Sequence, residues 1–167
     1  MLRTVLPALL LALGVSGSAL AQPTVFLVRH AERADSAPGK SPAMGSDPDL
    51  SDAGRTRAAS LAATLKDAGI TAIYVTKYKR TQQTAAPLAK SLGLTPIIVT
   101  ADDNGALAAA IKGAAGNVLV IGHSNTIPAA IKALGISTEV AIGDDDYDDL
   151  FIVSTGLPPA LVRLHYK

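Results

Sequence analysis

The sequence predicts an α/β fold of three layers, in which helices cover both faces of a mainly parallel central sheet. Short runs of Val, Ile and Leu alternate along the chain with longer segments of helical character. This alternation is typical of β-α-β units, which build parallel sheets. Basic and polar residues directly follow several of the apolar runs, and this is the usual place of a ligand site in an open α/β sheet.

The first 21 residues have the pattern of a secretory signal peptide. Arg3 provides a positive start, residues 5–15 are mainly apolar, and the Ala-Leu-Ala sequence at 19–21 fits a small-x-small cleavage signal. The apolar stretch is too short to span a membrane. We therefore expect cleavage, a single domain over residues 22–167, and a periplasmic or secreted protein with no membrane attachment after cleavage.

The domain is expected to begin with a buried strand, a long loop and a helix. Residues 25–28 are apolar and mostly β-branched, which predicts the strand. Residues 36–49 are rich in Ser, Pro, Gly and Asp, and a loop of this length often lines a site. A helix over residues 53–68 follows, with Ser51 or Asp52 as its N-cap and a glycine just past its end.

Two strands and two helices form the middle of the chain. Residues 72–76 predict a strand, and residues 79–92 predict a helix that continues through Pro87 and stops before a glycine. Residues 96–100 predict the next strand, and residues 104–114 the next helix.

The last part of the chain adds one more β-α pair and a hairpin. Residues 118–121 consist only of Val, Leu and Ile, which predicts a buried strand, and residues 127–134 predict a helix followed by glycine. Residues 150–154 and 160–166 predict two final strands. We expect them to pair as an antiparallel hairpin across residues 156–159.

Charge and cysteine content exclude several kinds of partner. Removal of Arg3, the one charged residue among the first 21, lowers the formal net charge from +1 to 0. A neutral domain has no general electrostatic attraction to nucleic acid or to an anionic membrane. The chain has no cysteine, which excludes disulfides and thiolate metal sites.

Three predicted strands end in basic residues. Arg29 and His30 follow the first strand, Arg80 follows the second, and His123 follows the strand over 118–121. Because these strands are expected to be parallel, their carboxyl ends meet at one edge of the sheet. Arginine binds two phosphate oxygens at once, and a helix N-terminus adds backbone donors. The pattern predicts a pocket for a phosphate group.

Four motifs in order resemble those of the histidine phosphatase superfamily, which has the phosphoglycerate-mutase-like fold. The Arg-His-Gly motif of that family corresponds to Arg29-His30-Ala31, with alanine in place of the usual glycine. The others correspond to LSDAGRTRA at 50–58, TKYKRTQQTA at 76–85 and GHSNTI at 122–127. Together they extend over nearly the whole mature chain.

The resemblance implies a metal-independent phosphomonoester hydrolase without cofactors. His30 would be the nucleophile and become phosphohistidine. The oxygens of the transferring group would be neutralised by Arg29, Arg80 and His123. Further substrate contacts are expected from Ser124, Asn125 and Glu32. The substrate would be a phosphorylated small molecule or a phosphoprotein, selected by residues 36–49, 102–105 and 139–149.

The general acid is the least defined role. Many members of the family place a Glu or Asp on an insertion between the third and fourth motifs, where this chain has only a short connection. Asp102 and Asp103 are the carboxylates there. We assign the role to Asp102, with Glu32 as the alternative outside the connection.

Three other interpretations remain open from the sequence. The same pocket could bind a phosphorylated ligand without hydrolysing it. A serine hydrolase would use Ser124 with an aspartate from 144–149 and His165, but the motif lacks its last glycine. The acidic run at 143–150 could be a calcium site. It lacks the glycine and the terminal glutamate of an EF-hand loop, and this absence favours a solvated loop.

Overall fold

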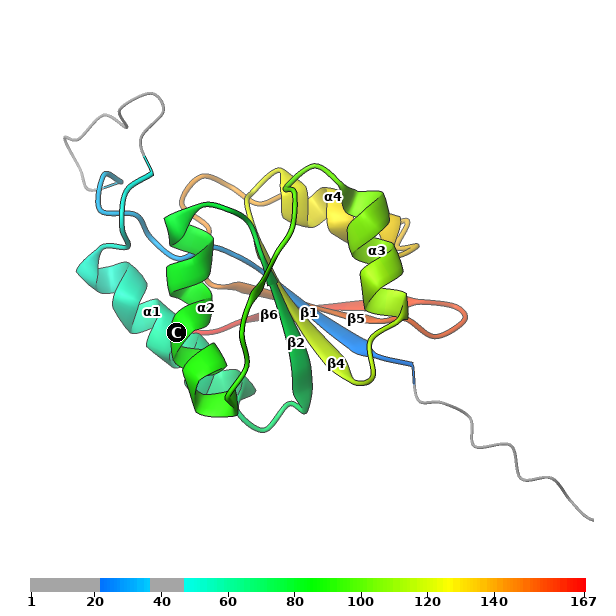
Figure 1. Cartoon of the computed structure of the whole chain (residues 1–167). Coiled ribbons are helices and arrows are strands. Elements are labelled where there is room, and N and C mark those ends of the chain that lie inside the picture. Colours follow the sequence, from blue (N-terminus) through cyan, green and yellow to red (C-terminus); the bar gives the residue numbers. More distant parts are fainter. Residues whose placement is uncertain (1–21, 37–46) are drawn as a thin grey trace, which may run out of the picture.

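A computed structural model of the chain describes residues 22–36 and 47–167. The predicted signal peptide and most of the predicted loop over 36–49 lie outside these residues. The described chain forms one six-stranded sheet and four helices (Figure 1). In chain order these are β1 (Thr24–Arg29), α1 (Asp52–Leu65), β2 (Ile70–Val75), α2 (Lys79–Leu92), β3 (Ile97–Ile98), α3 (Asn104–Lys112), β4 (Asn117–Gly122), α4 (Thr126–Ala133), β5 (Asp149–Ser154) and β6 (Ala160–His165).

The sheet is mixed, with a parallel half that carries the site. Its strand order is β3-β2-β4-β1-β5-β6. The first four strands in this order are parallel, whereas β5 runs antiparallel to β1 and pairs with β6 as the predicted hairpin. The carboxyl ends of β1, β4 and β2 therefore lie side by side at one edge of the sheet.

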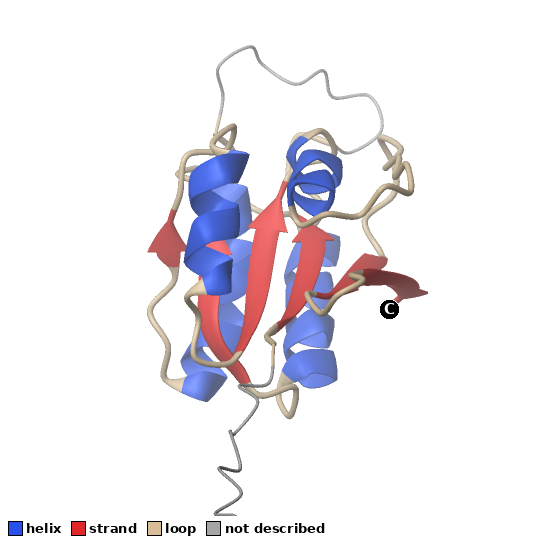
Figure 2. Ribbon diagram, turned by 90° about the vertical axis from the view of Figure 1, so that its right-hand side faces the viewer, coloured by secondary structure: helices blue, strands red, loops and turns tan. Residues whose placement is uncertain are grey.

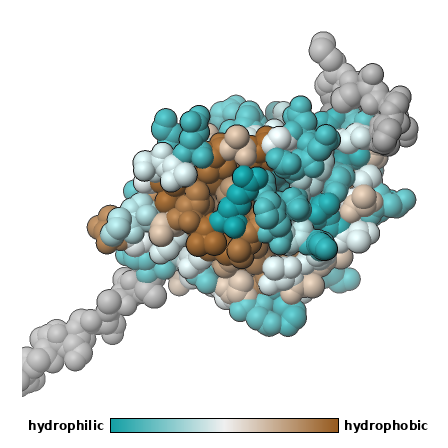
Figure 3. Space-filling view, turned by 180° about the vertical axis from the view of Figure 1, so that it is seen from behind, coloured by the Kyte–Doolittle hydropathy of each residue, from teal (hydrophilic) through white to brown (hydrophobic). Residues whose placement is uncertain are grey.

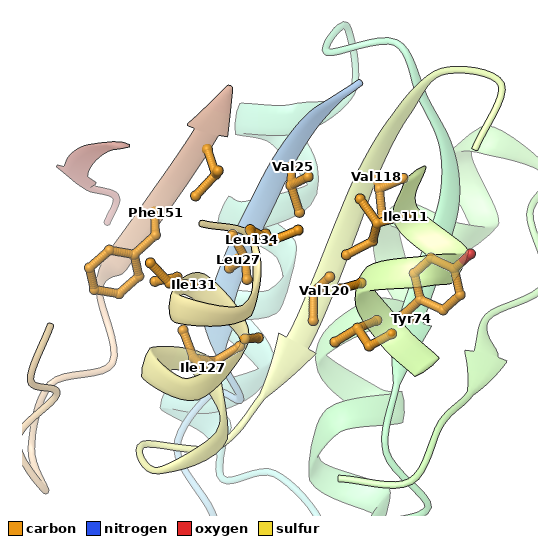
Figure 4. Packing of buried hydrophobic residues seen from close by; sticks show 14 of the residues in the cluster. Val25, Leu27, Tyr74, Ile111, Val118, Val120, Ile127, Ile131, Leu134 and Phe151 are labelled. Atoms are coloured by element: carbon orange, nitrogen blue, oxygen red, sulfur yellow. The ribbon is translucent and has the colours of Figure 1, made fainter. Parts of the chain in front are cut away.

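The predicted three layers are confirmed. Helices α1 and α2 cover one face of the sheet and α3 and α4 the other (Figures 1 and 2). Side chains alternate along β1, so that Val25 and Leu27 pack beneath α3 and α4, while Phe26 and Val28 face α1 and α2. Figure 4 shows the first of these cores. Each large aliphatic side chain buried in this way contributes about 1.5–3 kcal/mol.

The start of α1 is fixed against the segment that follows β1. The Ser51 hydroxyl accepts a hydrogen bond from the Gly54 amide (3.0 Å), so Ser51 and not Asp52 is the N-cap. A Cβ at Gly54 would lie 2.2 Å from the carbonyl oxygen of Glu32. The glycine of the second motif thus allows α1 to approach the segment after His30.

Some elements are shorter than predicted. Helix α1 ends at Leu65 and α3 at Lys112. Strand β3 keeps only Ile97 and Ile98, because it is an edge strand that pairs with just two residues of β2. At the opposite edge, β6 leaves Val162 and Leu164 about half exposed. Figure 3 shows apolar residues gathered on one face of the molecule. None of the described helices is long and apolar enough to span a membrane.

Candidate active site

The first and fourth motifs meet at the shared edge of β1 and β4. Arg29 is the register partner of Gly122, and the His30 amide donates to the Gly122 carbonyl (2.9 Å). As a result the ring centroids of His30 and His123 lie 5.4 Å apart. Strand β2 ends beside β4, which places Thr76 within reach of His123 (3.1 Å from Oγ1 to Nε2).

The Gly-His turn requires its glycine. A Cβ at Gly122 would lie 2.7 Å from Oγ1 of Thr126 and 2.9 Å from the side chain of Ile127. Without a side chain at 122, the first turn of α4 folds back close enough for Thr126 Oγ1 to accept from the His123 amide (2.9 Å). Ser124 and Asn125, two predicted substrate contacts, lie between His123 and the helix.

The backbone carbonyl of the next residue fixes the tautomer of His30. Its Nδ1 lies 2.8 Å from the carbonyl oxygen of Ala31. A carbonyl can only accept, so Nδ1 carries the proton and Nε2 keeps its lone pair. The side chain is buried, and burial lowers its pKa to about 3, opposed by the Ala31 hydrogen bond and assisted by His123, Arg80 and Arg29. His30 is therefore neutral at physiological pH.

His123 is also neutral in this structure, whereas its expected role in neutralising the oxygens of the transferring group calls for a protonated ring. Its pKa is lowered to about 4, mainly by burial and also by the charges of Arg80 and Arg29, whereas Asp102 opposes the change. Sequence motifs do not reveal this, because burial and two nearby guanidiniums decide the protonation state. A bound phosphate dianion would raise the pKa of His123 by attraction.

Arg29 is held by the loop at 143–147. Its Nη1 donates to the carbonyl oxygens of Gly143 (2.7 Å) and Asp144 (2.8 Å), and its Cζ lies 4.1 Å from the ring centroid of Tyr147. The acidic run therefore contacts Arg29 through backbone carbonyl groups. The carboxylate of Asp146 accepts a hydrogen bond from the Gly143 amide (2.8 Å).

Arg80 is placed over a second tyrosine. Its Cζ lies 4.2 Å from the ring centroid of Tyr78, and Nη1 is 3.7 Å from the carboxylate of Asp47. The Nε atoms of both Arg80 and Arg29 are buried without a hydrogen-bond partner among the described residues. Such a donor costs about 1–3 kcal/mol when left unpaired, and phosphate oxygens are suited to satisfy it.

Sequence reasoning missed the two tyrosines. Tyr78 lies 5.4 Å from His123 and Tyr147 lies 6.2 Å from His30, measured between ring centroids. Tyr78 stands inside the third motif, where its position beside Arg80 was a usable signal. Tyr147 lies in the acidic run, and nothing in its local sequence indicated a role.

The three carboxylate candidates have different surroundings. Asp102 borders a pocket together with Thr76 and acts electrostatically on His123. Asp103 caps α3, because its Oδ1 accepts from the Ala106 amide (2.9 Å). Glu32 accepts from Nε of Arg57 (2.8 Å).

The serine-hydrolase triad is excluded by strand order. Ser124 follows β4 and His165 ends β6, with β1 and β5 in between. With neighbouring strands about 4.8 Å apart, the two are separated by about 14 Å. His165 does approach Asp148 and Asp149, but both oxygens of Asp149 accept from Arg163, which leaves few free ligand atoms for a metal.

Acid is expected to destabilise the protein, in part through His30. Its pKa falls from the ordinary 6.5 to about 3 on folding, so between these values the unfolded chain binds a proton that the folded protein lacks. Stability is therefore lost as the pH falls below 6.5, by roughly 2 kcal/mol at pH 5. Urea unfolding at pH 7 and 5 should show a smaller acid loss for His30→Gln. Equal losses would contradict the lowered pKa.

Comparisons with known proteins agree with this geometry. Residues 25–102 match the model of the histidine phosphatase superfamily (branch 1). The fold resembles that of the protein histidine phosphatase SixA complexed with tungstate, at TM-score 0.65 and 19% identity over 85% of this chain and 96% of that one.

It also resembles mycobacterial glucosyl-3-phosphoglycerate phosphatase with VO3, at TM-score 0.67 and 15% identity over 86% of this chain and 98% of that one. No curated protein sequence matches the chain. The family match spans the first three motifs, and the fold places the fourth beside the first. The family match and the fold together therefore identify the chain as similar to the histidine phosphatase superfamily and indicate an enzyme of the phosphatase class.

Proposed function

We propose that the protein is a metal-independent phosphomonoester hydrolase that forms a phosphohistidine intermediate on His30. The observation that carries the proposal is the hydrogen bond from Nδ1 of His30 to the Ala31 carbonyl. It leaves a neutral imidazole with its lone pair on Nε2, as a nucleophile requires. A site that only bound phosphate would gain more from a donor at this position, because a lone pair repels phosphate oxygens.

In the first step, Nε2 of His30 forms a bond to phosphorus while the bond from phosphorus to the leaving oxygen breaks. Asp102 supplies the proton that this oxygen needs. Arg29 and Arg80 stabilise the charge on the remaining oxygens, and His123 gains a proton or donates a hydrogen bond there. In the second step, Asp102 takes a proton from water, which attacks phosphorus and releases phosphate and free His30.

The charges of the site support an oxyanion ligand without a metal. Both guanidiniums are close enough to His30 to lower its pKa, and each has a buried Nε without a partner among the described residues. Two proteins of similar fold have been determined with tungstate and with VO3, which are oxyanions of a shape related to phosphate.

Chelators are expected to leave activity unchanged, whereas vanadate should inhibit. The positive charge at the site comes from Arg29 and Arg80, so EDTA removes nothing that the reaction needs. Vanadate can adopt the five-coordinate geometry of the transition state. The measurement is hydrolysis of p-nitrophenyl phosphate with and without each compound. A strict requirement for a divalent ion would refute the mechanism, and binding of phosphate without any turnover would favour the non-catalytic alternative.

We also place this activity outside the cytoplasm. The support is the sequence of the first 21 residues, which has a positive start, an apolar stretch and a small-x-small cleavage signal. Fractionation of expressing cells, with N-terminal sequencing of the product, tests this directly. A full-length protein in the cytoplasmic fraction would contradict it.

A further inference from the structure

An open pocket of about 410 Å³ adjoins the catalytic residues on the β3 side. It lies between the turn after β2 and the segment after β3, and its lining includes Thr76, Tyr78 and Asp102. Thr76 and Tyr78 both contact His123, so the pocket adjoins the proposed phosphate site. Its volume is within the range of sites for small molecules.

The order of the strands places this pocket opposite the nucleophile. Along the sheet edge, His30 follows β1, His123 follows β4, Thr76 follows β2, and Asp102 comes shortly after β3. In phosphoryl transfer the attacking and leaving atoms lie roughly in line on opposite sides of phosphorus. A phosphoryl group between His30 and Thr76 therefore directs its leaving group toward β3.

The position of Asp102 leads to the same pocket. A general acid must stand within reach of the leaving oxygen. Asp102 is in the pocket lining and is close enough to His123 to affect its pKa. The carboxylate assigned to protonate the leaving group and the space available to that group are thus in one place.

The lining of the pocket indicates what kind of leaving group it accepts. Ile98 is 60% exposed although it is a large aliphatic residue, and Val99 and Ala101 lie beside it. Lys77 is the cationic residue of the lining, and its Nζ lies 5.6 Å from the ring centroid of Tyr78. The pocket therefore offers an apolar wall and one positive charge.

From these observations we infer that the pocket binds the leaving group of a small phosphomonoester that has an apolar body and a second anionic group. The apolar body packs on Ile98, and the anion pairs with Lys77. The inference rests on the proposed function and gives it a substrate class. It adds residues 77 and 98 to the segments expected to select the substrate.

The test compares phenyl phosphate with 4-carboxyphenyl phosphate as substrates. In the wild type, the carboxylate should raise kcat/KM. Lys77→Gln should lower the ratio of the two kcat/KM values by about 3- to 5-fold, the size expected for one exposed ion pair. Use of the ratio cancels any general effect of the substitution on the fold or on the phosphate site. Lys90→Gln, which removes an exposed charge near the end of α2, should leave the ratio unchanged.

A second variant tests the apolar wall. Ile98→Ser should lower kcat/KM for phenyl phosphate by about 5- to 10-fold, as expected for the loss of aliphatic contact with a ligand. The inhibition constant of this variant for vanadate should stay within about twofold of the wild-type value, because vanadate occupies only the phosphate site.

Each failure has a separate meaning. An unchanged ratio in Lys77→Gln together with an unchanged kcat/KM in Ile98→Ser would overturn the inference while leaving the phosphatase intact. Faster turnover of a phosphopeptide than of either aryl phosphate would overturn the small-molecule class. Undiminished activity of His30→Ala would instead overturn the proposed function.

Discussion

Replacement of His30 by alanine is expected to abolish hydrolysis of phosphomonoesters, with a loss of about 10⁴-fold or more in kcat. In the proposed mechanism the imidazole is the nucleophile of the first step, so the loss should appear in kcat for every substrate. His30 is buried beside two guanidiniums, and none of the described residues nearby offers another neutral imidazole except His123. That ring has its Nε2 turned toward Thr76, so it is not placed to replace His30.

The same variant gives a chemical test of the intermediate. Wild-type enzyme quenched during turnover of a labelled substrate should contain phosphate that is stable to base, labile to acid and located on His30. His30→Ala should contain none. His123→Ala serves as the matched control, because it loses a neighbouring imidazole but keeps the nucleophile, and it should still become labelled, though more slowly. Label on Ser124 would show that the nucleophile has been assigned wrongly.

The fold class was accessible from the sequence because burial on both faces leaves a clear pattern. The strand at 118–121 consists only of aliphatic residues, since α1 and α2 cover one face of β4 and α3 and α4 cover the other. The extent of β3 was not accessible. Residues 96–100 have the composition of a strand, but only Ile97 and Ile98 have register partners in β2 at the edge of the sheet.

The convergence of His30, Arg80 and His123 was likewise accessible, because parallel strands bring their carboxyl ends to one edge. The hydrogen bonds that hold the Arg29 guanidinium in place could not be predicted from the sequence. They depend on carbonyl oxygens of residues 143 and 144, and every residue type has a carbonyl. The charge of His123 was also beyond the sequence, because it is set by burial and by charges from other strands.

The sequence also could not decide between the neighbouring residues Asp102 and Asp103 as the general acid. Both follow β3, and the sequence cannot tell which one caps the next helix. In the structure Asp103 Oδ1 accepts from the Ala106 amide at the start of α3, whereas Asp102 lies in the pocket lining near His123. The capping bond occupies Asp103, and this favours Asp102 as the proton donor of the proposed mechanism.

Asp102→Asn is therefore expected to slow phosphoryl transfer from alkyl phosphates by about 10²- to 10⁴-fold, the usual contribution of a general acid. An alkoxide is a strong base and needs a proton as it departs. Nitrophenolate is a weak base and leaves almost unaided, so the loss with p-nitrophenyl phosphate should be much smaller. The rate to measure is single-turnover formation of phosphohistidine. In the proposed mechanism Asp102 also assists the later attack of water, so steady-state rates would combine both effects.

Asp103→Asn is the matched control for this experiment. Asparagine caps helices as well as aspartate does, so this variant removes the same charge one residue away while keeping α3 intact, and it should leave both substrates nearly unaffected. Equal losses on the two substrates in Asp102→Asn would mean that the carboxylate binds substrate or supports the fold. No loss on either would transfer the role to Asp103, to Glu32 or to water. A loss confined to the alkyl phosphate is the result that identifies Asp102 as the acid, because only proton transfer to the leaving oxygen depends on how basic that oxygen is.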